Sequence, residues 1–259
     1  MADARVKALI LAGGVSWTGD PVALLRLGNR TLLQITTDAL TQLSFLTTIG
    51  VVGPKEVLDQ APPTFVKVAA AKSLWDNVFL GCRALDLSRD EWVLLCAVDM
   101  PFVTAQALER FFALARERSA DLTYLAVPLD SVKRLLGNDQ VHRTFARLKE
   151  GILTGGNVFL LRGRCLTALD LVAQKALNSR KSLWRLALLA GPQLILKFVT
   201  GQLSVKDLEK RAENILRHSC YGVVADLPEI AFDIDKPADY ELARKIVNQK
   251  NFRFGSGTD

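Results

Sequence analysis

The sequence predicts an α/β fold, a three-layer sandwich in which helices flank a mostly parallel sheet. Short apolar or β-branched runs alternate with segments of helical periodicity through the first half of the chain. This alternation indicates parallel strands joined by right-handed crossovers. The 259 residues, 49% hydrophobic and 23% charged, suffice for a sizeable core. The chain has no Pro- or Ser-rich linker and no repeat, so we expect a single domain over residues 1–250.

Five strands are expected in the first half, at residues 6–11, 48–52, 65–69, 92–98 and 122–127. Between them, apolar residues recur at the spacing of a helix that packs one face on a sheet. These residues are Leu32, Ile35, Ala39 and Leu43, then Val78, Cys82 and Leu85, then Leu108, Phe111, Phe112 and Ala115.

The rhythm changes after Ser131. We expect a polar loop over residues 133–149, the stretch Thr154-Gly155-Gly156-Asn157 and a strand at 158–161. A helical insertion then spans about residues 165–220. Its last helix starts with a capping box at Ser204, and its predicted buried stripe consists of Leu208, Ala212, Ile215 and Leu216. Strands at 221–224 and 230–234, a helix from 237 to about 247 and a disordered tail at 251–259 complete the prediction.

Cysteine and histidine usage excludes several classes of site. Cys82, Cys96, Cys165 and Cys220 contain no Cys-x-x-Cys pair, and the chain has only two histidines. A zinc ribbon, a dithiol redox site, a disulfide scaffold and a multi-histidine metal centre are therefore disfavoured, which leaves a hard cation on carboxylates. No apolar run resembles a signal peptide or a spanning helix. We expect a reduced, cytoplasmic protein.

Positive charge is concentrated in one part of the chain. The formal net charge is +6, but residues 141–220 contain 14 Lys or Arg against 5 Asp or Glu. This excess indicates either a solvated basic face or an anionic partner, such as a nucleotide, a phosphoester or an acidic membrane. No RNA-recognition motif or zinc finger accompanies it, so nucleic acid is not expected as a partner.

A glycine pair follows the first predicted strand, in Leu11-Ala12-Gly13-Gly14. Ligands of open parallel sheets lie beyond the carboxyl ends of the strands, where glycines let backbone N–H groups approach a phosphate. A plain tight turn is the alternative interpretation. The segment 14–19 has the G-x-x-x-x-G spacing of a P-loop, but Asp20 stands where that loop needs lysine.

Three aspartates follow two other predicted strands. Asp99, in Val98-Asp99-Met100-Pro101, leaves the fourth strand at the same edge as the glycine pair. Asp233 and Asp235 alternate with Ile234, so in an extended chain both face one side. Carboxylates placed in this way suit Mg²⁺, whereas turn or helix-capping roles, with Asp239 as the cap of the last helix, are the alternative.

Together these motifs resemble the molybdenum-cofactor guanylyltransferase-like nucleotidyltransferases. The resemblance rests on the order and spacing of four segments, Leu11–Gly14, Val98–Pro101, Thr154–Asn157 and Asp233–Asp239, and covers about residues 5–247. It implies a Rossmann-like fold of the nucleotide-diphospho-sugar transferase type. It also implies transfer of a nucleotidyl group from a nucleoside triphosphate to an acceptor phosphate, with release of pyrophosphate.

The resemblance also implies roles for single residues. Leu11, Ala12, Gly13, Gly14 and Asn77 would bind the nucleotide, and Gly156 and Asn157 the acceptor. Asp99 and Asp235 would be catalytic, and Asp99, Asp235 and Asp233 would hold Mg²⁺. The implied partners are a nucleoside triphosphate and an anionic small-molecule acceptor.

The loop after the glycines departs from the family pattern. Thr18 stands in the place of an arginine and Val22 in the place of a lysine, two cations that clamp the triphosphate in the family. Substitutes for a lost clamp are sought among Arg26, Arg30, Lys149 and Lys236. Two hypotheses therefore stand, an active Mg²⁺-dependent nucleotidyltransferase and a degenerate relative that binds a nucleotide or a protein partner.

A basic, apolar stretch at residues 175–197 carries five cations and no acid. A helix buried against the sheet or against a second subunit explains its apolar residues. The alternative is a peripheral membrane contact, in which Trp184 and the leucines insert among anionic lipids.

Overall fold

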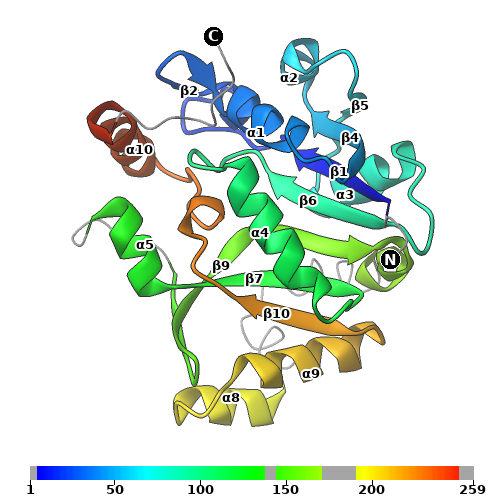
Figure 1. Cartoon of the computed structure of the whole chain (residues 1–259), viewed down its shortest axis with the longest axis vertical. Coiled ribbons are helices and arrows are strands. Elements are labelled where there is room, and N and C mark those ends of the chain that lie inside the picture. The colour runs from blue at the N-terminus through cyan, green and yellow to red at the C-terminus, as the bar shows by residue number, and fades with distance from the viewer. Residues whose placement is uncertain (1–4, 138–143, 171–190, 251–259) are drawn as a thin grey trace.

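The computed structural model describes residues 5–137, 144–170 and 191–250. Their strands form a mixed sheet in the order β10-β7-β9-β6-β1-β4-β5, with β8 paired to β9 (Figure 1). The bounds are β1 Val6–Leu11, β4 Leu46–Gly53, β5 Val66–Ala69, β6 Trp92–Ala97, β7 Leu122–Pro128, β8 Ala146–Leu148, β9 Gly151–Arg162 and β10 Cys220–Val224. The predicted α/β sandwich with a mostly parallel sheet is confirmed.

Parallel pairing joins β1 to β4 and β6, β4 to β5, and β7 to β10. The long strand β9 runs antiparallel to both of its neighbours, β6 and β7. Its first residues therefore lie at the edge where the parallel strands end. Thr154-Gly155-Gly156-Asn157, expected before a short strand at 158–161, lies inside β9 at that edge.

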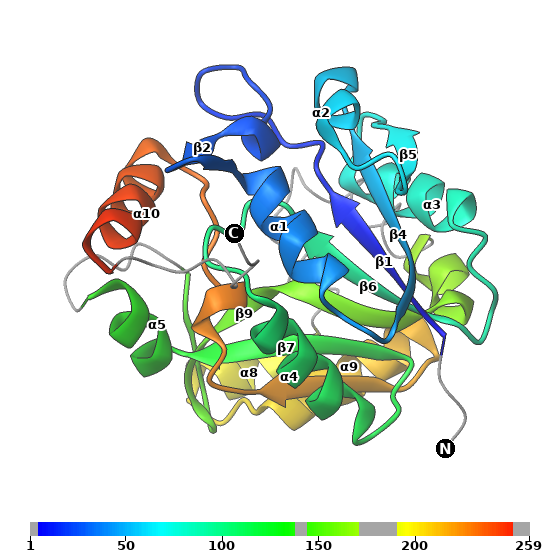
Figure 2. The same cartoon turned by 45° about the horizontal axis from the view of Figure 1, so that its top comes forward.

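Helices cover both faces of the sheet (Figures 1 and 2). α1, α4 and α5 pack on one face and α3 and α9 on the other. The larger core, with Phe102, Phe111 and Phe232, belongs to the first face, and a smaller one with Cys82 and Leu161 to the second. The helices are α1 Leu32–Thr41, α2 Lys55–Gln60, α3 Leu74–Ala84, α4 Ala105–Arg116, α5 Leu129–Leu136, α8 Pro192–Val199, α9 Val205–Leu216 and α10 Pro237–Lys250.

Side-chain caps fix where several helices begin. Thr31 and Gln34 form a capping box at α1, and Ser73 and Thr104 cap α3 and α4. The predicted box at Ser204 is confirmed, because its hydroxyl accepts from the Asp207 N–H while Asp207 bonds back. Short elements complete the described chain: η1 Val22–Leu24, β2 Arg26–Leu27, β3 Arg30–Thr31, η2 Gly163–Cys165 and η3 Pro228–Ile230.

Some expected elements differ from the structure. The polar loop expected at 133–149 is wrong at both ends, because α5 continues to Leu136 and β8 starts at Ala146. The strand expected at 230–234 is wrong, since η3 ends at Ile230 and an irregular segment follows. The buried stripe of α9 is wrong at Leu208, which is 42% exposed over an apolar pocket, whereas Leu216 is buried.

Two predictions concern residues outside the described part of the chain. The tail at 251–259 is one, and the stretch 175–190 of the basic segment is the other. Among the described helices, none is long and apolar enough to cross a membrane. The helix α8, which contains the end of the basic segment and the two residues after it, leaves Leu196, Phe198 and Val199 exposed.

Candidate active site

The site lies along the sheet edge where β1, β6 and β7 end and β9 begins. The register places Val158 of β9 opposite Cys96 of β6, so Asn157 stands beside the end of β6. Asp99 follows β6 by two residues, and Gly13 follows β1 by two. One edge of the sheet therefore gathers segments that lie up to about 145 residues apart in the chain.

Asp99, Asp233 and Asp235 come together at this edge. Each carboxylate has an oxygen within 4.8 Å of the other two, and Asp99 and Asp233 are half-buried while Asp235 is exposed. A backbone hydrogen bond of 3.0 Å from Ile234 N–H to the Asp99 carbonyl holds the two segments together. Ile234 is buried in the core between the two aspartates. The prediction that Asp233 and Asp235 face one side is confirmed, although the segment is not a strand.

Three close carboxylates form a donor set for a hard divalent cation such as Mg²⁺ or Ca²⁺. Mutual repulsion of three charges at this separation is relieved when a cation lies between them. Cys96 of β6 is buried in the larger core and is not part of this group, and burial raises the pKa of its thiol to about 12. The geometry therefore fits the metal that the sequence predicts.

Asp239 has the capping role that was its alternative interpretation. Its carboxylate accepts hydrogen bonds from Lys236 N–H at 2.9 Å and from Asp235 N–H at 3.3 Å. These bonds fix the entry into α10 and, with it, the backbone that carries Asp235. Asp239 thus helps to position the carboxylate of Asp235.

A cleft of about 400 Å³ opens on one side of the aspartates. It is formed by the ends of β1 and β6, the start of α3 and part of β9. Its wall consists of Leu11, Gly13, Gly14, Ala71, Lys72, Ser73, Leu74, Asn77, Leu95, Ala97, Asp99, Asn157 and Phe159. Leu11, Gly13, Gly14 and Asn77, predicted to bind the nucleotide, thus share one cleft, whereas Ala12 is fully buried beneath it.

Asn77 joins two of the walls of this cleft. Its side-chain oxygen accepts from Ala71 N–H at 2.6 Å, so it holds the loop that precedes α3. Its amide nitrogen lies only 2.9 Å from the place where a Cβ of residue 13 would stand. Gly13 therefore has no room for a side chain, and the close approach of Asn77 to the glycine loop depends on it.

A second cavity, of about 430 Å³, opens on the other side of the aspartates. Its wall consists of Tyr124, Thr144, Thr154, Gly155, Gly156, Asn157, Asp233, Asp235, Lys236 and Asp239. Asn157 borders both cavities and donates a 3.3 Å hydrogen bond to the Ala231 carbonyl. Gly156 and Asn157, predicted to bind the acceptor, thus line this second cavity together with two of the aspartates.

The loop between Gly14 and Val22 is closed on itself. Val15 and Pro21 form a β-bridge, and Ser16 N–H donates to the Asp20 carbonyl at 2.8 Å. Thr18, in the place of the family arginine, donates to the Asp20 carboxylate at 2.9 Å. Val22, in the place of the family lysine, is buried in the larger core. Neither position offers a cation to the cleft.

Trp17, at the tip of this loop, packs on Tyr240 of α10 with ring centroids 5.7 Å apart. Tyr240 in turn donates its hydroxyl to the Arg26 carbonyl at 2.7 Å. The loop is therefore held to the C-terminal helix by an aromatic contact.

Lys72 is a site residue that the sequence reasoning missed. It lies three residues after β5, in the wall of the first cleft, and among the residues that line this cleft it is the cation. The available signal was its position just beyond a predicted strand, at the carboxyl edge of the sheet. Of the four cations considered as substitutes, Lys236 lines the second cavity, and Arg26, Arg30 and Lys149 line neither cavity.

The sequence matches the family model of the MobA-like NTP transferase domain over residues 8–187, which is more than half of the chain. The chain belongs to this family. The family resemblance drawn from the four motifs is thereby confirmed. A search among curated proteins gave no match.

Solved structures show the same fold. A hypothetical transferase from Thermus thermophilus has a TM-score of 0.78 and 29% identity, over 91% of this chain and 99% of that one. The 2-C-methyl-D-erythritol 4-phosphate cytidylyltransferase of Francisella tularensis has a TM-score of 0.58 and 15% identity, over 93% and 99%. A CMP:2-keto-3-deoxy-manno-octonic acid synthetase complexed with CTP gives 0.57 and 14%, over 95% and 99%. At the two lower identities the similarity concerns the fold alone.

Proposed function

We propose that this chain is a Mg²⁺-dependent nucleotidyltransferase that joins a nucleotidyl group to an acceptor phosphate and releases pyrophosphate. One observation carries the proposal: Asp99, Asp233 and Asp235 gather where the two cavities meet at Asn157. In this assignment the cleft over Gly13 and Gly14 binds the nucleoside triphosphate. The cavity beside Lys236 binds the acceptor phosphate.

The three aspartates would hold the metal through carboxylate oxygens. Mg²⁺ at this place would neutralise charge on the triphosphate and on the pyrophosphate that leaves. The glycine pair is exposed in this cleft, so its backbone N–H groups would be able to approach the phosphates. Lys72, in the wall of the same cleft, would supply positive charge to the phosphates.

The acceptor phosphate has its own neighbours. Lys236 attracts it into the second cavity, and Asn157 stands between it and the nucleotide. An oxygen of the acceptor phosphate attacks the α-phosphorus and forms the new P–O bond. The bond from the α-phosphorus to the bridging oxygen of the β-phosphate breaks, and pyrophosphate leaves with the electron pair.

A second candidate function is a degenerate relative that binds a nucleotide or a protein partner without turnover. The closed loop favours it, because Thr18 is bonded to Asp20 and Val22 is buried in the core. The three clustered carboxylates favour the enzyme, since a pure binding module has no need of a metal site next to two cavities.

Isothermal titration of the four common nucleoside triphosphates, with and without Mg²⁺, tests the proposal. We expect Mg²⁺ to strengthen the binding of at least one of them about tenfold or more, a difference of about 1.4 kcal/mol. Asp99→Asn should abolish the Mg²⁺-dependent part, because it removes a carboxylate from the metal site and leaves the shape of the residue.

Asp59→Asn is the control, because Asp59 is exposed on α2 and pairs with Lys55, away from both cavities. It should bind nucleotide as the wild type does. Failure of every triphosphate to bind in Mg²⁺ contradicts the proposal. If nucleotide binds but no phosphate acceptor in a broad panel yields pyrophosphate, the degenerate relative is favoured.

A further inference from the structure

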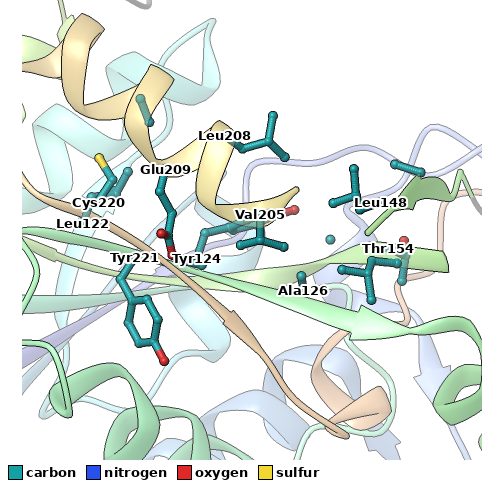
Figure 3. A pocket seen from close by; sticks show the side chains of 15 residues that line it. Leu122, Tyr124, Ala126, Leu148, Thr154, Val205, Leu208, Glu209, Cys220 and Tyr221 are labelled. Atoms are coloured by element: carbon teal, nitrogen blue, oxygen red, sulfur yellow. Dashed lines mark hydrogen bonds between the residues drawn. The ribbon is translucent and has the colours of Figure 1, made fainter. Parts of the chain in front are cut away.

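An apolar pocket of about 240 Å³ lies between α9 and the sheet, beside the second cavity (Figure 3). Figure 3 shows Val205 and Leu208 of α9 on one side, and Ala126 and Leu148 on the strands across from them. The wall is almost entirely apolar. It consists of Leu122, Tyr124, Ala126, Ala146, Leu148, Leu153, Thr154, Gly155, Val205, Leu208, Glu209, Ala212, Cys220, Tyr221 and Gly222.

Two glycines allow close packing in the walls of this pocket. A Cβ on Gly222 would lie 2.5 Å from the Val205 side chain, so the glycine lets α9 approach the sheet. At Gly155 the Tyr124 hydroxyl occupies the space of a missing side chain, so the ring of Tyr124 lies over β9. Tyr124 also stacks on Phe159, with centroids 4.8 Å apart.

This arrangement joins the pocket to the candidate site. Tyr124, Thr154 and Gly155 line both the apolar pocket and the second cavity. Phe159, the stacking partner of Tyr124, lines the nucleotide cleft. The three spaces therefore adjoin one another: the nucleotide cleft meets the acceptor cavity at the sheet edge, and the apolar pocket continues from the acceptor cavity beneath α9.

The acceptor cavity and the apolar pocket differ in the charged residues of their walls. The acceptor cavity has Lys236 and the candidate metal site in its wall. The apolar pocket has Glu209, whose carboxylate accepts from Gly222 N–H at 2.8 Å and lies 3.9 Å from the guanidinium of Arg118. Asp233, Asp235 and Asp239 also line the acceptor cavity, so a phosphate would be attracted to it when Mg²⁺ neutralises the metal site beside Lys236. Glu209 repels a phosphate from the apolar pocket, whereas a hydrocarbon group gains by entering it.

We propose that the acceptor is amphiphilic: a phosphate held beside Lys236 and joined to a hydrocarbon chain or ring that lies in the apolar pocket. This inference rests on the proposed function, since it identifies the substrate class of the same site. The volume suits it, because an apolar cavity of about 150 Å³ holds one benzene molecule. Tyr124 lines both the acceptor cavity and the apolar pocket, and this continuity favours an acceptor that occupies both spaces over a second copy of the chain or its own residues 171–190.

Titration of a series of monomeric alkyl phosphates tests the inference. Methyl, butyl and octyl phosphate are titrated by calorimetry into the full chain in the presence of Mg²⁺, below the micelle concentration of octyl phosphate. We expect the affinity to rise about two- to fourfold for each methylene until the pocket is full, because each one leaves water. Octyl phosphate has seven more methylenes than methyl phosphate, and if five of them enter the pocket at twofold each it should bind at least about thirtyfold more tightly.

Two variants localise the effect. Ala212→Phe fills the pocket from α9 and should remove the preference for the long chain, while methyl phosphate binds as before. Leu208→Gln makes the exposed rim polar at little risk to folding and should reduce the preference severalfold. Asn214→Phe is the matched control, because Asn214 is exposed on the same helix and does not line the pocket. It should retain the preference.

Equal affinities for methyl and octyl phosphate overturn the inference, as does a long-chain preference that survives both pocket variants. Occupation by residues 171–190 would give equal affinities. Occupation by a second copy would give a dimer in sedimentation that Ala212→Phe dissociates, which also overturns it. Triphosphate binding is measured on the same samples. If no triphosphate binds but octyl phosphate is still clearly preferred, the proposed function is refuted. The acceptor cavity and the apolar pocket would then remain a binding site for a phosphate with an apolar chain.

Discussion

At the scale of single residues, the loop shows how a site can lose its usual cations while its carboxylates stay together. Val22 has become part of the core, so a lysine there would have to leave apolar neighbours to reach the cleft. Thr18 is turned toward Asp20 within its own loop. Among the described residues that line the cleft, Lys72 is the one that would supply positive charge for a triphosphate.

Replacement of Lys72 by Gln tests this assignment. We expect the triphosphate affinity to fall about tenfold, as for one charge-assisted hydrogen bond. The monophosphate affinity should fall about twofold or less, because Lys72 would act on the β- and γ-phosphates. Calorimetry of both nucleotides in Mg²⁺ measures the difference.

Lys67→Gln is the matched control, since Lys67 is exposed on β5 and does not line the cleft. It should change neither affinity. Equal losses for the triphosphate and the monophosphate in Lys72→Gln would show that Lys72 does not act on the terminal phosphates.

At the scale of elements, the periodicity of the sequence predicted where strands lie, but it did not predict how they pair. β1 and β6 follow from apolar runs, and their ends correctly located Gly13 and Asp99 at one edge. The direction of β9 cannot be predicted from its hydrophobic pattern, because side chains point to alternate faces of the sheet in parallel and antiparallel strands alike. Asn157 reaches the site only because β9 is antiparallel.

The segment after η3 illustrates the opposite case. Phe232 and Ile234 are buried in alternation, which resembles a strand in the sequence. One backbone bond to Asp99 replaces a ladder there, so no strand forms. The alternation still places Asp233 and Asp235 on one side, since the face of a side chain follows from an extended backbone and not from the ladder.

One ionic network links three elements at the other end of the sheet. Asp121, just before β7, is paired with Arg164 of η2 and accepts from Ser219 N–H before β10. Burial raises the pKa of Asp121, but Arg164 and the Ser219 hydrogen bonds outweigh it and hold the pKa below the ordinary value. The carboxylate therefore stabilises the fold above its ordinary pKa of 3.8, and this contribution is lost as the pH falls toward the lower folded value.

We expect Asp121→Asn to lower the free energy of unfolding at pH 7 by about 2 kcal/mol, since it leaves Arg164 and the β7–β10 junction without their charged partner. The loss of stability between pH 5 and pH 3 should be shallower in the variant than in the wild type. Urea unfolding at several pH values measures both effects. Asp90→Asn is the control, because Asp90 is 80% exposed and lies near the same Arg164. Equal effects of the two variants would contradict the role of burial.

At the scale of the whole molecule, the nucleotide cleft and the acceptor cavity lie along the carboxyl edge of one sheet, and the apolar pocket continues from the acceptor cavity beneath α9. The family match and the TM-score of 0.78 to the Thermus structure show a shared fold, and this fold brings the strand ends together at one edge of the sheet. The general rule that ligands lie beyond the ends of parallel strands predicted that Gly13 and Asp99 come together, and the structure places them in one cleft. The apolar pocket was beyond prediction, because it depends on how closely α9 packs at Gly222.

Anomalous diffraction from crystals soaked with Mn²⁺ and a non-hydrolysable triphosphate tests most directly whether the three aspartates hold a metal beside a bound nucleotide. We expect a manganese peak within coordination distance of Asp99, Asp233 and Asp235. We also expect phosphate density over Gly13 and Gly14 that reaches toward Lys72. Triphosphate bound in this cleft with no manganese at the three aspartates, or manganese and triphosphate bound elsewhere, would contradict the proposed function.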